Sequence, residues 1–258
     1  MKIGLSTSSF YPLETEKALV KIGESGIKDT ELFFNAQCEL EKDFIKELTE
    51  IKNYYGINIV SIHPTMSLAE SFMLFSAYNR RKQAGLCEFK RYGEICEELG
   101  AKYIILHGGK PNGILDDRQY CERFVEISDA SAENGGILLQ ENVAKYRAGN
   151  LDFLKMMANE LGDRAKFCLD IKQCIRGGYS PFETAEALKG KIYHIHISDH
   201  SADRDCLIPG DGGFDFMSFF SQIKETGYTG YGIIEVYESA YVNFEELLKK
   251  SSNFIKIL

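Results

Sequence analysis

The stretch YHIHIS, residues 193–198, has the pattern of a β-strand with two unlike faces. Successive side chains of a strand point to opposite sides, so the two histidines share one face with Ser198. The tyrosine and the two isoleucines fall on the other face. Three of the chain's five histidines lie within residues 194–200. The pattern predicts a strand that presents polar side chains on one side of a sheet.

Similar short apolar runs recur along the chain, and each is followed by a stretch with apolar residues at helical spacing. The predicted strands are 2–7, 30–34, 58–63, 103–108, 137–143, 166–171, 193–198 and 232–237. The predicted helices are 15–25, 43–55, 79–99, 117–134, 151–161, 181–188, 216–226 and 244–255.

Glycines mark the ends of the helical segments, where a left-handed residue commonly ends a helix. They are Gly26, Gly56, Gly100, Gly135, Gly162, Gly190 and Gly227. Eight strands that alternate with eight helices predict an α/β fold with a parallel sheet, and eight units in ~250 residues predict its closure into a (β/α)8 TIM barrel. We expect one such domain over residues 1–258. An open doubly wound sheet is disfavoured, because no GxGxxG follows the first strand and the units are evenly spaced.

Composition narrows the classes of function. The net charge is −8, which favours neither a nucleic acid nor an anionic membrane surface as a partner. No apolar run approaches the ~20 residues of a membrane span. The N-terminus, MKIGLSTSSF, is expected to be a strand rather than a signal peptide, and the seven scattered cysteines predict reduced thiols, so we expect a cytoplasmic protein.

Polar side chains occur at or near the ends of seven of the eight predicted strands. They are Glu31, His63, His107, Glu141, Asp170, His196 and Glu235. The carboxyl ends of the strands of a TIM barrel meet at the active site, so these side chains should converge. A lone histidine or glutamate at such a position is usually a hydrogen-bonded core residue or the start of a solvated loop. Buried carboxylates are costly unless they are paired or bind a metal, and seven together indicate a site centred on a cation.

Four of these residues, Glu141, Asp170, His196 and Glu235, supply three carboxylates and one imidazole. This set suits a hard or borderline divalent ion, and it favours Mn²⁺, with Mg²⁺, Zn²⁺ and Co²⁺ as alternatives. His63 and His107 could form a second, zinc-like position or hydrogen-bond a substrate.

The stretches LLQENV, CLDIKQ, HIHISD and IIEVY, in this order, resemble the xylose-isomerase-like TIM barrels, as does the loop LIPGDGGFDF at 207–216. This superfamily contains sugar isomerases and epimerases, inosose isomerases and dehydratases, hydroxypyruvate isomerase, and AP endonucleases with three zinc ions. The resemblance covers nearly the whole chain. It implies that Glu141, Asp170, His196 and Glu235 bind one divalent metal ion, and that Glu141 and Glu235 transfer the proton.

That chemistry is physically coherent. A metal ion that polarises a carbonyl acidifies the neighbouring C–H and stabilises an enediolate, and two carboxylates can remove and return the proton. A carboxylate bound to a dication is a poor base unless its surroundings compensate, so the two roles of Glu141 and Glu235 compete.

The nuclease branch of the superfamily usually carries a histidine three residues after the aspartate of strand 6, where this chain has Gln173. It also carries Asp-x-His after strand 7, where this chain has Asp203-Arg204-Asp205. The third zinc site of that branch would therefore lack both of its imidazoles in this chain. The negative net charge also argues against a nucleic acid as the substrate. Gln173 also departs from the epimerases that place a substrate-binding histidine there.

The sequence thus predicts a metal-dependent isomerase or epimerase of a sugar, sugar phosphate or inosose, with an inosose-type dehydratase or a zinc-dependent AP endonuclease as alternatives. The expected substrate is a small polyhydroxy carbonyl compound, and a homo-oligomer is possible. The expected substrate contacts are Glu31, His63, His107, Gln173 and Arg204. Within HIHISDH we expect His194 to fill the barrel core and His200 to be exposed, while Asp199 supports a metal ligand from behind.

Overall fold

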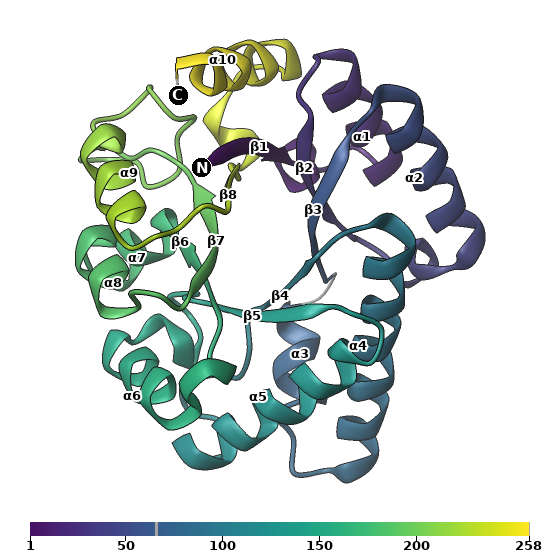
Figure 1. Ribbon diagram of the computed structural model, residues 1–258, viewed down its shortest axis with the longest axis vertical. Coiled ribbons are helices and arrows are strands. Elements are labelled where there is room, and N and C mark those ends of the chain that lie inside the picture. The colour runs from purple at the N-terminus through teal and green to yellow at the C-terminus, as the bar shows by residue number, and fades with distance from the viewer. Residues whose placement is uncertain (65–66, 258) are drawn as a thin grey trace.

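The computed structural model describes residues 1–64 and 67–257, with side chains described outside Ser67, Leu68 and Ile257. Eight parallel strands pair in sequence order and close into a barrel, with helices around the outside (Figure 1). The predicted (β/α)8 TIM barrel is confirmed. The strands are β1 (Lys2–Ser6), β2 (Asp29–Phe33), β3 (Asn58–His63), β4 (Tyr103–Leu106), β5 (Ile137–Glu141), β6 (Phe167–Asp170), β7 (Ile192–Ile197) and β8 (Tyr231–Ile234).

All eight predicted helices are present, with ends shifted by at most a few residues. They are α1 (Thr15–Glu24), α2 (Lys42–Tyr55), α4 (Asn79–Leu99), α5 (Asp117–Ala132), α6 (Leu151–Leu161), α8 (Pro181–Ala187), α9 (Phe216–Glu225) and α10 (Phe244–Ile257). Two further helices were not predicted, α3 (Ser67–Met73) and α7 (Ile171–Gly177). Five short 3₁₀ segments occur in the loops: Thr7–Phe10, Gln37–Leu40, Arg147–Gly149, Gly162–Arg164 and Glu238–Ala240.

Several strands are shorter than predicted at their carboxyl ends. Strand β4 ends at Leu106, β5 at Glu141 and β8 at Ile234, so the last residues of the predicted runs belong to loops. Strand β6 ends at Asp170 because this residue is the N-cap of α7, and its Oδ1 accepts the N–H of Gln173 at 3.0 Å. The polar residues that close these strands therefore lie where the chain leaves the barrel.

The seven glycines that were predicted to end helices all have positive φ. Gly56 and Gly100 are left-handed C-caps of α2 and α4, with φ of 62° and 70°. Because residues with a Cβ rarely adopt this conformation, these glycines set where the helices end.

The apolar core has two parts. A large cluster joins the outer faces of the strands to the helices, and a small cluster contains Val60, Tyr103, Ile105, Leu139 and Cys168. The small cluster lies inside the barrel, because Cys168 pairs in register with His194 and the Tyr103 ring lies 5.9 Å from the His194 ring. It forms the floor beneath the polar strand ends.

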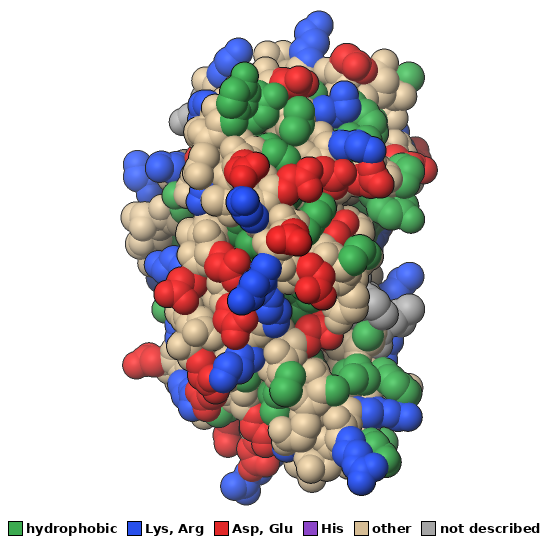
Figure 2. All heavy atoms as spheres, turned by 90° about the vertical axis from the view of Figure 1, so that its right-hand side faces the viewer, with side chains coloured by type: hydrophobic (Ala, Val, Ile, Leu, Met, Phe, Trp, Pro, Cys, Tyr) green, Lys and Arg blue, Asp and Glu red, His purple; other side chains and the backbone are tan. Residues whose placement is uncertain are grey.

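The surface and the thiols agree with the composition. On the face in Figure 2, acidic and basic side chains are interspersed, and the described residues on it form no purely basic stripe. All seven cysteines are free, and five of them, including Cys168 and Cys174, are buried. Across residues 1–64 and 67–257, no helix combines the length and the apolar character needed to cross a membrane.

Candidate metal centre

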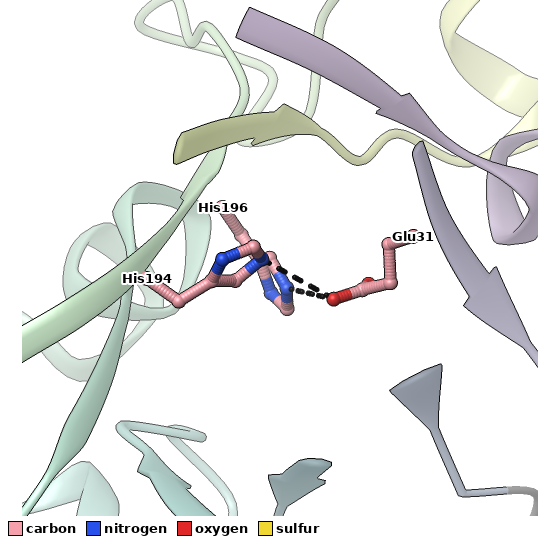
Figure 3. Close-up of side chains that lie close together, drawn as sticks. All are labelled: Glu31, His194 and His196. Carbon is pink, nitrogen blue, oxygen red and sulfur yellow. Dashed lines mark hydrogen bonds and ion pairs between the residues drawn. The ribbon is translucent and has the colours of Figure 1, made fainter. Parts of the chain in front are cut away.

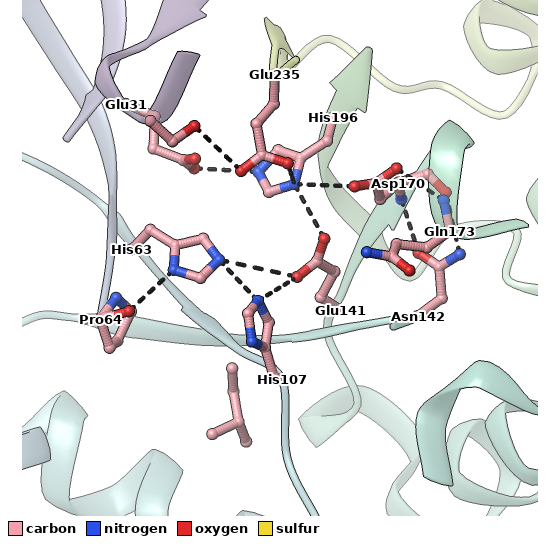
Figure 4. A network of polar contacts seen from close by, with 12 residues as sticks. Glu31, His63, Pro64, His107, Glu141, Asn142, Asp170, Gln173, His196 and Glu235 are labelled. Atoms are coloured by element: carbon pink, nitrogen blue, oxygen red, sulfur yellow. Dashed lines mark hydrogen bonds and ion pairs between the residues drawn. The ribbon is translucent and has the colours of Figure 1, made fainter. Parts of the chain in front are cut away.

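Four side chains meet at the carboxyl ends of β5, β6, β7 and β8. Glu141 and Asp170 are the last residues of β5 and β6, His196 is the penultimate residue of β7, and Glu235 follows β8 directly. One ligand atom from each lies within 4.8 Å of the others, and all four residues are buried (Figure 4). The structure therefore brings together the four residues that the sequence singles out as metal ligands.

The Nδ1 atom of His196 faces the three carboxylates. It lies 3.2 Å from Glu141 Oε1, 3.7 Å from Glu235 Oε2 and 3.8 Å from Asp170 Oδ2. Asp170 Oδ1 is already engaged as the N-cap of α7, so only Oδ2 turns toward the group. Asn142 fixes Asp170 further, because its side chain exchanges hydrogen bonds with the N–H and C=O of that residue.

The other nitrogen of His196 is occupied by Glu31 (Figure 3). His196 Nε2 lies 3.2 Å from Glu31 Oε2, and His194 Nε2 lies 3.3 Å from the same oxygen. The Ser61 hydroxyl donates to that oxygen at 2.7 Å. Burial opposes a charge on His196, but nearby acidic groups raise its pKa well above the usual value, so Nδ1 must release a proton before it can bind a cation.

Glu31, an expected substrate contact, lies away from the other expected contacts. It is completely buried and lies behind His196, outside the lining of the cavity described below. The sequence placed Glu31 at the rim because it is polar, whereas it lies in the middle of β2, two residues before the strand ends. His194 is buried against Ser61 and Glu31, which confirms its expected place in the barrel core.

The donor set fits a divalent cation. Glu141 Oε2 and Asp170 Oδ2 are buried and accept no hydrogen bond. The nitrogen atoms nearest to them are His107 Nε2, at 3.0 Å from Glu141 Oε2, and Lys172 Nζ, at 3.2 Å from Asp170 Oδ2. Buried carboxylates need a charged or donating partner, and three of them with one imidazole suit Mn²⁺ or Mg²⁺ chemistry.

A second candidate group consists of His63, His107 and Glu141. The Nε2 atoms of the two histidines are 2.9 Å apart, and that of His63 is 3.9 Å from Glu141 Oε2. Burial opposes a charge on His63, but contact with Glu141 and the nearby Glu31 raises its pKa to about 9. This group could hold a second ion or bind substrate oxygens. These are the two roles that the sequence allows for His63 and His107.

The carboxylates are held in their ionised form. Burial alone would raise the pKa of Glu141, but His107, His196 and His63 outweigh it and hold the pKa well below its usual value. Burial likewise opposes the charge on Glu235, while Lys172 and His196 lower its pKa. Both groups therefore carry a negative charge that a cation can bind.

A cavity of about 440 Å³ opens above this group. Among its lining residues, Glu141, Glu235, His63, His107 and Gln173 were predicted from the sequence, and Ser8, Tyr11, Phe33, Asn35, Lys172, Tyr237 and Glu238 were not. Asp170 and His196 lie beneath the cavity and are 1% exposed. The volume is within the range of small-molecule sites, ~300–1,000 Å³.

Three expectations for the loops fail. Arg204 is exposed, donates to the carbonyl of Ser239 and is outside the cavity lining.

Asp199 supports no metal ligand. Its carboxylate shapes the loop between β7 and α9 by accepting the N–H groups of His200, Gly210, Gly212 and Phe214. His200 is half-buried, with its ring 5.7 Å from that of Phe214.

Lys172 is the principal residue that sequence reasoning missed. It lies in the first turn of α7, is 1% exposed, and places Nζ 2.8 Å from Glu235 Oε2. Burial opposes its charge, but Asp170 and Glu235 raise its pKa well above the usual value, so it is an ammonium. The available signal was its position two residues after Asp170 in CLDIKQ.

Known proteins resemble this chain over most or all of its length. A family described as "Xylose isomerase-like TIM barrel" matches residues 19–258. Fructoselysine 3-epimerase of Shigella flexneri is 23% identical over 267 residues, covering 98% of this chain and 95% of that protein. Inosose isomerase of Bacillus velezensis is 24% identical over 260 residues, covering 84% and 93%. A crystal structure of D-psicose 3-epimerase in the presence of D-fructose superposes with a TM-score of 0.81 at 16% identity, covering 100% and 98%.

Proposed function

The chain belongs to the xylose isomerase-like TIM barrel family, and on that premise we propose that it is a divalent-metal-dependent isomerase or epimerase of a small polyhydroxy carbonyl compound. The observation that carries the proposal is the convergence of Glu141, Asp170, His196 and Glu235 beneath one cavity. The names of the relatives, fructoselysine 3-epimerase and inosose isomerase, support a sugar or an inosose as the substrate class.

The proposed metal ligands are these four residues. A divalent ion bound there would polarise the substrate carbonyl and acidify the neighbouring C–H bond. His196 presents Nδ1 because Glu31 holds its other nitrogen, and Asp170 presents Oδ2 because α7 holds Oδ1. The chain thus orients its ligand atoms before any ion arrives.

Glu141 and Glu235 are the proposed acid and base. Both are ionised and line the cavity, and they enter it from different strands, β5 and β8. One carboxylate removes the proton next to the carbonyl, which leaves the substrate as an enediolate. Delivery to the other face of a proton that the second carboxylate has taken up from water gives an epimer, and return of the abstracted proton to the neighbouring carbon gives an isomer. His63, His107 and Gln173 line the same cavity and are the proposed contacts for substrate oxygens.

Hydrogen exchange tests this proposal without knowledge of the product. Ketoses, their phosphates and inososes are incubated with the protein and Mn²⁺ in D₂O, and each recovered compound is weighed by mass spectrometry. At least one compound should gain one deuteron per exchanged C–H. Glu235→Gln should abolish the exchange, because the amide cannot accept the proton, whereas Glu225→Gln at the exposed end of α9 should retain it.

Two outcomes would redirect the proposal. If deuterium continues to enter the substrate in Glu235→Gln, the acid–base assignment is wrong. If no divalent ion binds to the protein, the metal centre itself is wrong.

Two alternatives share parts of the site. A dehydratase would begin with the same proton removal and then lose hydroxide, so its product would be 18 Da lighter than its substrate. An AP endonuclease is favoured only by the second candidate metal group, His63, His107 and Glu141. Cleavage of a duplex with an abasic site, with more than one metal ion bound per chain, would establish the nuclease instead.

A further inference from the structure

Lys172 places a buried ammonium among the proposed metal ligands. Its Nζ lies 2.8 Å from Glu235 Oε2 and 3.2 Å from Asp170 Oδ2, and 4.7 Å from the centroid of the Tyr237 ring. The side chain is 1% exposed, so this is not a solvated surface lysine whose contacts are incidental. An ammonium this deep in the protein is retained by its carboxylate partners.

The same two oxygens belong to the group of four that would hold the metal ion. Glu235 Oε2 and Asp170 Oδ2 are the atoms that lie 3.7 Å and 3.8 Å from His196 Nδ1. A dication coordinated by these oxygens would lie beside the ammonium, and like charges at such distances repel strongly where water is excluded. The ammonium and the ion would therefore compete for the negative charge of the same two carboxylate oxygens.

We propose that Lys172 is the exchangeable counter-ion of the metal centre. In the metal-free chain its ammonium offsets part of the negative charge of Asp170 and Glu235, and a divalent ion must draw these oxygens away from it. In the loaded site the ammonium and the ion together would carry three positive charges beside the three carboxylates. The inference rests on the metal centre of the proposed function and adds that the chain itself weakens metal binding.

Metal titration of charge-deleted variants tests the inference. The wild-type protein, Lys172→Met and Lys172→Gln are stripped with a chelator, and their Kd for Mn²⁺ is measured by calorimetry. Both variants should bind Mn²⁺ about tenfold or more tightly, because the competing charge is gone. The matched control is Lys110→Met. Lys110 also lies over a tyrosine ring, that of Tyr146 at 3.8 Å, but has no ion pair with the four ligands among the described contacts, so its removal should leave the Kd unchanged.

Thermal unfolding supplies a readout that does not depend on activity. In excess chelator, Lys172→Met should melt below the wild-type protein, because three carboxylates then lie together without their ammonium. Saturating Mn²⁺ should raise its Tm by more than it raises that of the wild type, as tighter binding to the folded state requires. A variant that folds only with Mn²⁺ present would be the extreme form of this result.

The outcomes separate the two proposals. An unchanged or weaker Mn²⁺ affinity in both variants, with normal binding by the wild type, overturns the role of Lys172 and leaves the metal centre standing. Metal-free Lys172→Met that is as stable as the wild type also overturns it. Absence of Mn²⁺ binding in every protein overturns both proposals.

Discussion

His196 shows how a single residue acquires a role from its two nitrogens. One nitrogen faces Glu31 and the other faces three carboxylates, so the residue joins the barrel core to the proposed metal centre. Glu31 would fix the ring and make Nδ1 a better donor, as carboxylates behind metal-binding histidines do. Glu31 is held ionised in turn: burial opposes its charge, but His196 and His194 hold its pKa well below the usual value.

Glu31→Gln should weaken Mn²⁺ binding by about tenfold or more, the cost of losing such a partner. The amide keeps the size of the side chain but accepts a weaker hydrogen bond from His196. Calorimetric titration measures the effect, and the control is Glu39→Gln. The Glu39 carboxylate accepts from Thr15 and Asn35, away from the histidines, so its loss should leave the affinity unaltered. Equal affinities for Glu31→Gln and the wild type would mean that Glu31 serves only the core.

The sequence was sufficient to predict the positions of residues that follow from the alternation of side chains along a strand. His194 and His196 share a face and differ in depth, and that difference separates a core histidine from a proposed ligand. The position of Glu31 behind His196 could not be predicted, because it depends on how β2 and β7 face each other across the barrel. Neither strand carries that information in its own sequence.

At the level of elements, most of the remaining errors lie in one short helix, α7, and in the long loop between β7 and α9. Helix α7 has only seven residues, too few for a clear helical pattern, and its first turn inserts Lys172 beside Glu235. The segment between β7 and α9 has no helix or strand of its own, so the sequence could not show that Asp199 shapes it or that Arg204 turns away from the cavity. Short elements and long loops are set by tertiary contacts rather than by local pattern.

Helix α3, the other unpredicted helix, is tied to the end of β4 by Glu70. Its Oε2 accepts the N–H groups of His107 at 2.9 Å and Gly108 at 3.0 Å, while its Oε1 has no partner among the side chains that the structure describes. Burial raises the pKa of this carboxyl above its usual value, although His107 and the two N–H groups oppose the rise. The folded state therefore binds this proton more tightly than the unfolded chain does.

This linkage predicts how stability depends on pH. A raised pKa in the folded state gives a contribution that is complete below the unfolded pKa and is lost as pH rises through the folded pKa. Glu70→Gln removes the buried charge, so it should raise Tm at pH 7, and the difference from the wild type should vanish toward pH 4. A gain of about 1 kcal/mol would appear as about 2–4 °C in a chain of this size. Differential scanning calorimetry across this pH range is the measurement, and a variant that melts lower than the wild type at pH 7 would contradict it.

At the scale of the whole molecule, the sequence was sufficient to predict the barrel architecture, because eight strand–helix units repeat evenly along the chain. Closure of the barrel is a different requirement, since β1 must pair with both β2 and β8. Gly4 and Gly232 lie at this seam, and the registers Gly4↔Ile233 and Ile3↔Gly232 place them on neighbouring strands. Lack of a side chain at Gly4 makes room for Asp29 of β2 and Ile233 of β8, and at Gly232 for Ile197 of β7 and Ile3 of β1.

Gly4→Ala should therefore destabilise the whole barrel rather than one element. A Cβ at Gly4 would lie 2.2 Å from the backbone oxygen of Asp29 and 2.8 Å from Ile233 Cδ1, so β1 would have to move away from β2. Overpacking of this kind costs about 1–3 kcal/mol, and a clash with backbone belongs at the upper end, which corresponds to a fall in Tm of about 6 °C or more. Gly213→Ala is the matched control, because no atom lies within 4 Å of its Cβ position and its φ is not positive. If the two variants unfold at the same temperature in a calorimetric scan, close approach at Gly4 does not limit the closure of the barrel.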